Sequence, residues 1–475
     1  MSLNFCDLLV LGGDLSGVIA ATLLAKRGMN VLLIDEEADN PHTANLITAL
    51  DSRVFKSLIS KLMIPESRIQ VVQENRVTCQ LIYPRHRVDL SSSRDQLLKE
   101  IDREFSTERT VFLDFLTEVD SLREKHLEAL LGFLPIVTHK EKKQFSQWVQ
   151  QIPDQTLKNL WQNMSPELQS LLKLQLRFLS RGPLIEPLTL QLLLYLSPEG
   201  CTTFSIRGGL KELKKIFFER LDYFGGMVHP LAGDQFEILA KGREIRAVKM
   251  ERHGFPTRCR FLLGNIDCQN FYRHLPTNLW SFLPKRRAEK LVPAEEQFFI
   301  QFEVEKEVLP EPMKENLVII EDPEKPLEEL NYLELNLSPR SRVEGETLLL
   351  TVGYRFSGQK EKGRDFFESL HLEIEKKLRD LIPFAGSSLR RIFPMAESEG
   401  TLFPDQDNFS LFQRQACQKR IYPASSASPF LTLPFKNGIL LGPNLLDWMG
   451  MEGKILGAMK GVDLIWEKES KIKKH

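Results

Sequence analysis

The sequence predicts an α/β protein: a Rossmann-type domain with a doubly wound, mostly parallel sheet, and an inserted α+β domain. Two observations lead to this fold class. A strand, a tight glycine turn, a helix and a second strand follow one another at the N-terminus. Glycine-punctuated segments in the middle and at the end of the chain then return it to the same sheet.

The N-terminal unit spans Phe5 to Asp35. The apolar run Leu8 to Leu11 predicts a buried strand, and Gly12 to Gly17 predicts a tight turn. Val18 to Arg27 has the composition of a helix, and Val31 to Ile34 that of a second strand. The result is a βαβ unit whose spacing suits a dinucleotide.

The candidate ligand-binding residues of this unit lie in the turn and at the end of the second strand. Gly12 makes the turn, Gly17 lets the helix pack on the sheet, and Asp35 would accept a ribose hydroxyl. The middle glycine of the pattern is replaced by an aspartate. The full candidate set here is Gly12, Gly13, Asp14, Ser16, Gly17 and Asp35.

Asp14 weakens the cofactor interpretation. Two unit charges about 5 Å apart interact by roughly 3 kcal/mol at an effective dielectric constant of about 20. An ionised Asp14 facing a diphosphate would therefore cost roughly a hundredfold in affinity. Two arrangements avoid this cost: a side chain that points into solvent, or a carboxyl group that takes up a proton.

Composition narrows the function classes. The 475 residues allow two or three domains, and 63 basic against 64 acidic residues give a net charge of -1, which argues against nucleic acid as a partner. Six cysteines without a CxxC pair argue against a zinc site and favour a reducing cytoplasm. We expect no signal peptide and no membrane-spanning segment, although peripheral membrane contact stays open.

Helical periodicity dominates residues 95 to 200. The segment from Leu168 to Leu196 carries more leucines than one helix face requires. These leucines are either packed core or the lining of a lipid-sized tunnel. If they line a tunnel, the apolar surface should open toward the Gly12 turn.

The middle of the chain repeats the glycine punctuation. Gly208-Gly209 precedes an amphipathic helix and Gly225-Gly226 ends it. Short strand-like pieces follow, and the last runs into Gly264-Asn265-Ile266-Asp267. The C-terminal segment Gly438 to Gly461 adds an apolar strand and a glycine-rich helix entry.

This order of motifs resembles the phytoene desaturase and flavin amine oxidase superfamily over the whole chain. The resemblance implies FAD as the cofactor, with an apolar, isoprenoid or lipid-like substrate. It also implies re-oxidation by oxygen, a quinone or free flavin, because no second GxGxxG unit exists for a nicotinamide nucleotide.

The resemblance implies a second group of cofactor-binding residues near the C-terminus. Gly442 matches the glycine of the superfamily's Gly-Asp pair, but Pro443 replaces the aspartate and lacks both the N–H and the carboxylate. Asn444 would supply part of that contact if the loop shifts by one residue. The helix entry keeps its glycines but adds the acidic Glu452, and its candidates are Gly450, Met451 and Gly453.

Three of the four cofactor-contacting motifs are thus altered: Asp14, Pro443, and the glycine-rich loop that is missing after Asp35. Two functions remain open. One is an FAD-dependent oxidoreductase, and the other is a flavin-free relative that keeps the fold to bind lipid or protein. No residue is marked out as catalytic. For Arg355, which ends an apolar strand, a structural role is favoured over a place in a pocket.

The predicted domain organisation is discontinuous. Residues 1–90, 201–276 and 406–475 are assigned to the dinucleotide-binding domain, and residues 91–200 and 277–405 to the substrate or cap domain.

Overall fold

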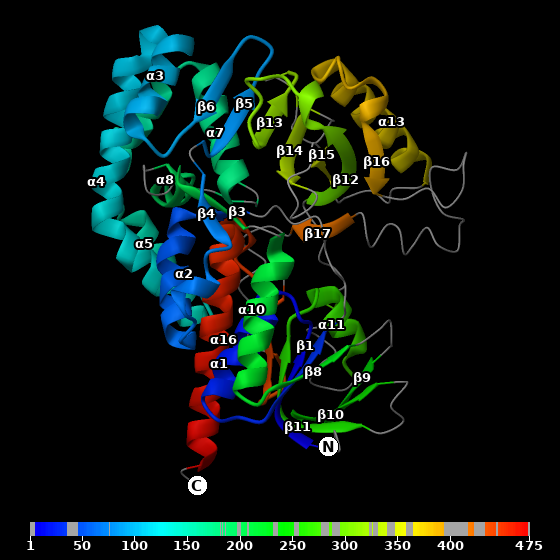
Figure 1. Ribbon diagram of the computed structural model, residues 1–475. Helices are drawn as coiled ribbons and strands as arrows, with labels where there is room; N and C mark the ends of the chain where they lie inside the picture. Colours follow the sequence, from blue (N-terminus) through cyan, green and yellow to red (C-terminus); the bar gives the residue numbers. More distant parts are fainter. Residues whose placement is uncertain are drawn as a thin grey trace.

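A computed structural model describes most of the chain (Figure 1). The described residues are 5–35, 46–75, 77–180, 182, 184–185, 187–196, 201–206, 209–230, 236–250, 256–276, 285–286, 295–322, 325, 331–339, 347–357, 364–393, 417–421, 433–442 and 445–473. They form two large sheets, one small three-stranded sheet, and helices that pack against all of them.

The first sheet contains the predicted βαβ unit. Its strand order is β8-β2-β1-β11-β10-β9, with β18 paired to the end of β11. The pairs β1–β2, β1–β11, β2–β8 and β11–β18 are parallel, whereas β9 and β10 form an antiparallel extension. The strands are β1 (Phe5–Leu11), β2 (Val31–Asp35), β8 (Met227–Pro230), β9 (Phe236–Lys241), β10 (Glu244–Met250), β11 (Thr257–Gly264) and β18 (Gly438–Leu440).

The two faces of this sheet are covered differently. Leu8 and Val10 face a core shared with α1 (Leu15–Lys26), α10 (Gly209–Tyr223) and α16 (Gly450–Lys473), which lie side by side in Figure 1. Leu9 and Leu11 face a second core. Strands β9 and β10 and the short helix α11 (Cys268–His274) supply its other residues.

The expected doubly wound arrangement, with helices on both faces, is confirmed in part for the described residues: α1, α10 and α16 cover one face, and the short helix α11 lies on the other. Side chains of the β9–β10 hairpin supply much of the rest of this second core. The reason is the alternation of apolar residues in the hairpin, which buries Phe236, Ile238, Ile245 and Val248 against the sheet. The mostly parallel pairing is confirmed at β1, β2, β8, β11 and β18.

The second sheet has the order β16-β12-β15-β14-β13-β5-β6, with β17 paired to β12. Helix α13 (Arg364–Leu381) packs on one of its faces through Phe367, Leu370, Ile374 and Leu378. The strands are β5 (Cys79–Ile82), β6 (Arg87–Leu90), β12 (Glu295–Glu305), β13 (Asn316–Ile320), β14 (Tyr332–Pro339), β15 (Thr347–Ser357), β16 (Arg390–Phe393) and β17 (Cys417–Ile421).

The hairpin of β5 and β6 differs from its predicted placement. The sequence assigns residues 1–90 to the dinucleotide-binding domain, but β5 pairs in parallel with β13 of the second sheet. Local pattern identifies a hairpin without identifying the distant strand edge that it joins. The remaining domain boundaries stay predictions.

Helices fill the space beside both sheets. They are α2 (Ala49–Leu62), α3 (Arg94–Glu104), α4 (Arg109–Phe133), α5 (His139–Gln150), α6 (Gln155–Gln162), α7 (Pro166–Ser180) and α8 (Thr189–Tyr195). Short 3₁₀ helices are Glu66–Arg68, Ser106–Glu108, Lys306–Val308, Gly386–Ser388 and Asp447–Met449. The small sheet joins β3 (Leu46–Thr48), β7 (Thr203–Ile206) and β4 (Val72–Glu74).

The leucines of α7 and α8 belong to the largest packed core. Leu168, Leu172 and Leu176 are buried there together with Leu190 and Leu193. Of the two roles left open for this stretch, the structure supports packed core for these residues. Among the described helices, none is both long enough and apolar enough to cross a bilayer.

Candidate dinucleotide-binding site

The Gly12–Gly17 turn lies at the carboxyl end of β1 and leads into α1. Gly12 has a positive φ of 98°, and a Cβ there would lie 2.5 Å from the Asn265 backbone oxygen. A Cβ on Gly17 would lie 2.1 Å from the Gly12 backbone oxygen. Both glycines are therefore required by the tight fit of the turn against α1 and the end of β11. Ser16 is buried within the first turn of α1.

Asp35, at the end of β2, folds back against Gly13. A Cβ on Gly13 would lie 2.2 Å from the Asp35 Oδ1 atom, so this glycine makes room for the carboxylate. The Asp35 side chain is 17% exposed, and the Lys214 Nζ atom lies 4.0 Å from Oδ1. The acidic group predicted to meet a ribose hydroxyl is thus beside the turn, with a lysine of α10 nearby.

Asn265 closes the turn from the end of β11. Its Nδ2 atom lies 3.4 Å from the backbone oxygens of both Gly12 and Asp14. Its Oδ1 atom is buried and has no hydrogen-bond partner within the part of the chain that the structure describes. The Asn-x-Asp motif therefore has two roles, because Asp267 accepts hydrogen bonds from Gln269 N and Asn270 N and caps α11.

Asp14 forms an ion pair that the sequence did not predict. It occupies the N-cap position of α1 but makes no side-chain cap bond. Instead, its Oδ2 atom lies 2.8 Å from the Nζ atom of Lys454 on α16. The Asp14 side chain is 41% exposed and that of Lys454 is 19% exposed, so the pair sits at the edge of the site.

The ion pair changes the electrostatic interpretation of the turn. Desolvation of the carboxyl group raises the pKa of Asp14, but the Lys454 ammonium, hydrogen bonds from Lys454 and the Leu15 backbone, and the charge of Lys214 together lower it below its ordinary value. Of the two arrangements expected from the sequence, uptake of a proton is therefore wrong. The carboxylate is charged and a lysine offsets it.

Lys454, Lys214 and Asn265 are the residues that sequence reasoning missed. One signal for Lys454 was available. A lysine near the N-terminal end of a helix opposes the helix dipole, which indicates that an anion lies close by. For Lys214 and Asn265, only the folded chain shows their proximity to the turn.

The C-terminal candidates are partly described. Gly442 has a positive φ of 61°, and its N–H together with that of Leu441 points to the Gly264 backbone oxygen. The structure therefore places Gly442 beside the end of β11, next to Asn265. Pro443 and Asn444 lie outside the described residues, and the role predicted for Asn444 stays a prediction.

The glycines at the start of α16 are required by backbone conformation and close packing, whether or not a cofactor binds there. Gly450 begins the helix with a positive φ of 56°. A Cβ on Gly453 would lie 2.3 Å from the Leu446 backbone oxygen, so this glycine serves close packing of the chain. Met451 packs against the main core, and Glu452 is 1% exposed. Cofactor contact by these residues remains a prediction.

The second sheet presents a buried polar network on the face opposite α13. Arg355 is 0% exposed; its Nη2 atom lies 2.7 Å from Glu334 Oε1 and its Nη1 atom 3.8 Å from Glu295 Oε2. Arg177 of α7 also binds Glu295, at 2.8 Å. The Tyr332 hydroxyl donates to Glu334 at 2.6 Å. The structural role favoured for Arg355 is confirmed by these contacts.

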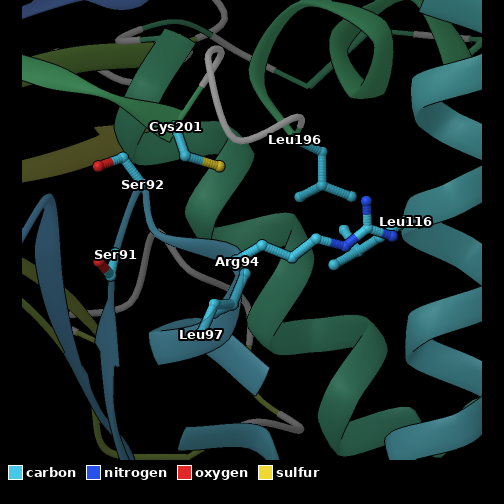
Figure 2. Close-up of a pocket in the computed structure, with 7 residues that line it drawn as sticks. All are labelled: Ser91, Ser92, Arg94, Leu97, Leu116, Leu196 and Cys201. Carbon is cyan, nitrogen blue, oxygen red and sulfur yellow. The ribbon is translucent and has the colours of Figure 1, made fainter. Parts of the chain in front are cut away.

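A small pocket lies in the helical region, away from the turn. Figure 2 shows the Arg94 side chain of α3 extending toward Leu116 of α4 and Leu196, with Cys201 beside Ser92 on the other side of the view. Its volume of about 10 Å³ is room for roughly one water molecule. The pocket therefore does not provide a substrate site.

Comparison of the sequence with known proteins identified no match. No protein-family model matches the chain, and no curated protein does.

Comparison of the fold with solved structures did identify neighbours. An oxidoreductase from Methanosarcina mazei is 12% identical with a TM-score of 0.59, covering 96% of this chain and all of the other. A protein from Pyrococcus furiosus is 12% identical with a TM-score of 0.56, covering 97% of each chain. Putrescine oxidase, in a structure with bound putrescine, is 13% identical with a TM-score of 0.54, covering 97% of this chain and 99% of the other.

These neighbours establish the fold. It is shared with putrescine oxidase, a flavin amine oxidase, and the resemblance inferred from the sequence motifs is confirmed at that level. The similarity runs over nearly the full length of each chain, so it includes both large sheets.

Proposed function

We propose that the protein is an FAD-dependent oxidoreductase related in mechanism to the amine oxidases. The observation that carries the proposal is the arrangement of Gly12, Gly13 and Gly17 around the end of β1 with Asp35 beside them. A side chain at Gly12 would collide with Asn265, one at Gly13 with Asp35, and one at Gly17 with the backbone of Gly12.

The residues fit the adenosine diphosphate part of the cofactor. The start of α1 offers backbone N–H groups and the positive end of the helix dipole to a diphosphate. Asp35 offers a carboxylate to a ribose hydroxyl, and Lys214 and Lys454 add positive charge. When bound, FAD would accept two electrons and a proton equivalent from the substrate. The protein would supply orientation and exclude water.

The substrate is proposed only as a class. The resemblance favours an apolar substrate, but the leucines that supported a lipid-sized tunnel are packed core. A large lipid-like substrate therefore has less support from the structure than from the sequence. A reducing compartment is proposed as well, because the buried residues Cys6, Cys79, Cys201 and Cys259 form no disulfide with one another.

The flavin-free alternative rested on three altered motifs. The Asp14–Lys454 ion pair weakens the first of these objections, because the repulsive charge has a counter-charge 2.8 Å away. The alternative remains an outcome of the test.

Calorimetric titration with FAD, and separately with FMN, tests the proposal. FMN carries the same ring system but lacks the adenosine and the diphosphate bridge. If the Gly12–Gly17 turn carries the affinity, FAD will bind at least about tenfold more tightly than FMN. A protein that binds neither compound would be the flavin-free relative.

A further inference from the structure

We propose that Lys454 binds a phosphate of the dinucleotide directly, and that Asp14 holds the Lys454 ammonium at the position where that phosphate arrives. The contact between Lys454 and the phosphate would then take the place of the close backbone approach that the middle glycine of the turn allows. This inference rests on the proposed function of the same site, and it adds a lysine and an aspartate to the binding machinery.

The first support is the position of Lys454. It lies one residue after Gly453, near the N-terminal end of α16, yet its Nζ atom reaches the start of α1. The backbone oxygens of Gly12 and Asp14 are held there by Asn265. The ammonium group is thus at the helix end where a Rossmann unit meets its diphosphate.

The second support is the surrounding charge. Lys214 of α10 also lies near the turn, with its Nζ atom 4.0 Å from Asp35 Oδ1. Two acidic and two basic side chains therefore flank the turn: Asp14 with Lys454, and Asp35 with Lys214. Their charges cancel. A diphosphate approaching this group meets no net negative charge, despite the two carboxylates.

The third support is the chemistry of an ammonium group. It has three N–H donors on a flexible four-carbon stem, so one contact with Asp14 is compatible with contact to a second anion. The Asp14 side of the pair is exposed to solvent, which leaves an approach for a ligand. An aspartate at this position then orients the lysine and at the same time competes with the phosphate for it.

A purely structural pair is the alternative. In that case Lys454 neutralises Asp14 and joins α1 to α16, but it never contacts the ligand. The two interpretations predict different ligand affinities for the double variant, in which both Asp14 and Lys454 are replaced by uncharged residues. If Lys454 only neutralises Asp14, its removal has no effect on binding once Asp14 is also uncharged. If Lys454 contacts phosphate, its removal weakens binding in either background.

The experiment is calorimetric titration of FAD, and in parallel ADP, into wild type, Asp14→Asn, Lys454→Met and the double variant. We expect Asp14→Asn to tighten binding severalfold. Lys454→Met should weaken it about tenfold or more, and the same loss should appear between Asp14→Asn and the double variant. Equal affinities of Asp14→Asn and the double variant would overturn the inference.

Control variants make the result specific. Lys460→Met removes another α16 lysine, one that lies 3.7 Å from Glu141, and should leave affinity unchanged. Lys454→Arg keeps the charge and should retain affinity within about threefold. If Lys454→Met fails to fold, the comparison of Lys454→Arg with Lys454→Gln replaces it, and equal binding by these two contradicts the inference.

ADP separates this inference from the proposed function. Binding of ADP that depends on Lys454, without binding of FAD, would support the phosphate contact and contradict the flavoenzyme. If FAD binds the Asp14→Asn variant with the same affinity whether or not Lys454 is present, the flavoenzyme would be supported and the phosphate contact by Lys454 contradicted. If neither compound binds any variant, both proposals fail.

Discussion

The carboxylate of Asp35 occupies the space that a side chain on Gly13 would need. The two residues lie on opposite sides of helix α1 in the sequence, yet a Cβ on Gly13 would be 2.2 Å from Asp35 Oδ1. This contact positions the acidic group at the end of β2 beside the turn that follows β1. A ligand that spans both strands would meet Asp35 and the turn together.

Gly13→Ala should therefore weaken FAD binding. The added methyl group would displace the Asp35 carboxylate, and we expect a loss of about tenfold or more in affinity, measured by calorimetry. Gly132→Ala is the control, because that glycine lies in α4 with nothing within 4 Å of a new Cβ. Unchanged affinity for Gly13→Ala would mean that Asp35 has no part in binding.

Asp14→Gly should tighten FAD binding by about an order of magnitude. Glycine removes the Cβ that keeps the backbone from the diphosphate, and it removes the anion that competes for Lys454. Titration of wild type and variant under identical salt conditions measures the difference. Equal affinities would show that Asp14 does not face the ligand.

Arg355→Met should strongly destabilise the protein. It would leave Glu334 buried without its cation, and removal of one partner from a buried ion pair costs about 3–5 kcal/mol. Urea denaturation measures the free energy of unfolding. Arg379→Met is the matched control, because Arg379 forms an exposed pair with Glu375 on α13, and we expect a loss below about 1 kcal/mol. Similar losses for both variants would contradict the structural importance of the network.

His371 should make stability depend on pH. It is 2% exposed, and burial together with the nearby Arg391 lowers its pKa to about 4, although Glu375 opposes the shift. The unfolded state binds a proton below about pH 6.5, so stability from neutral His371 is complete above that pH and is lost as the pH falls toward 4.

Between pH 7.5 and 5.0, wild type should lose about 2 kcal/mol more than His371→Gln. Urea denaturation at the two pH values measures this difference, and His126→Gln, which removes a half-buried histidine elsewhere, is the control. An identical pH dependence for wild type and His371→Gln would show that His371 is not the responsible group.

The sequence predicted the N-terminal unit well because its signals are local. The strands and helix expected between Leu8 and Ile34 are present as β1, α1 and β2. Glycine pairs likewise mark the two ends of α10, since turn chemistry depends on neighbouring residues.

Pairings between distant segments were not predictable in this way. The parallel pairing of β5 with β13 joins strands more than two hundred residues apart. The contact of Lys454 with Asp14 spans 440 residues, and neither residue type indicates its partner. The placement of the binding site around the turn stays a prediction, and the charge that offsets Asp14 was found only in the folded chain.

The visible absorption spectrum of the purified protein shows whether it carries a flavin. We expect the protein, as isolated or after incubation with FAD and removal of the excess, to show an oxidised-flavin spectrum that dithionite bleaches. A colourless protein that also retains no added FAD would contradict the proposed function.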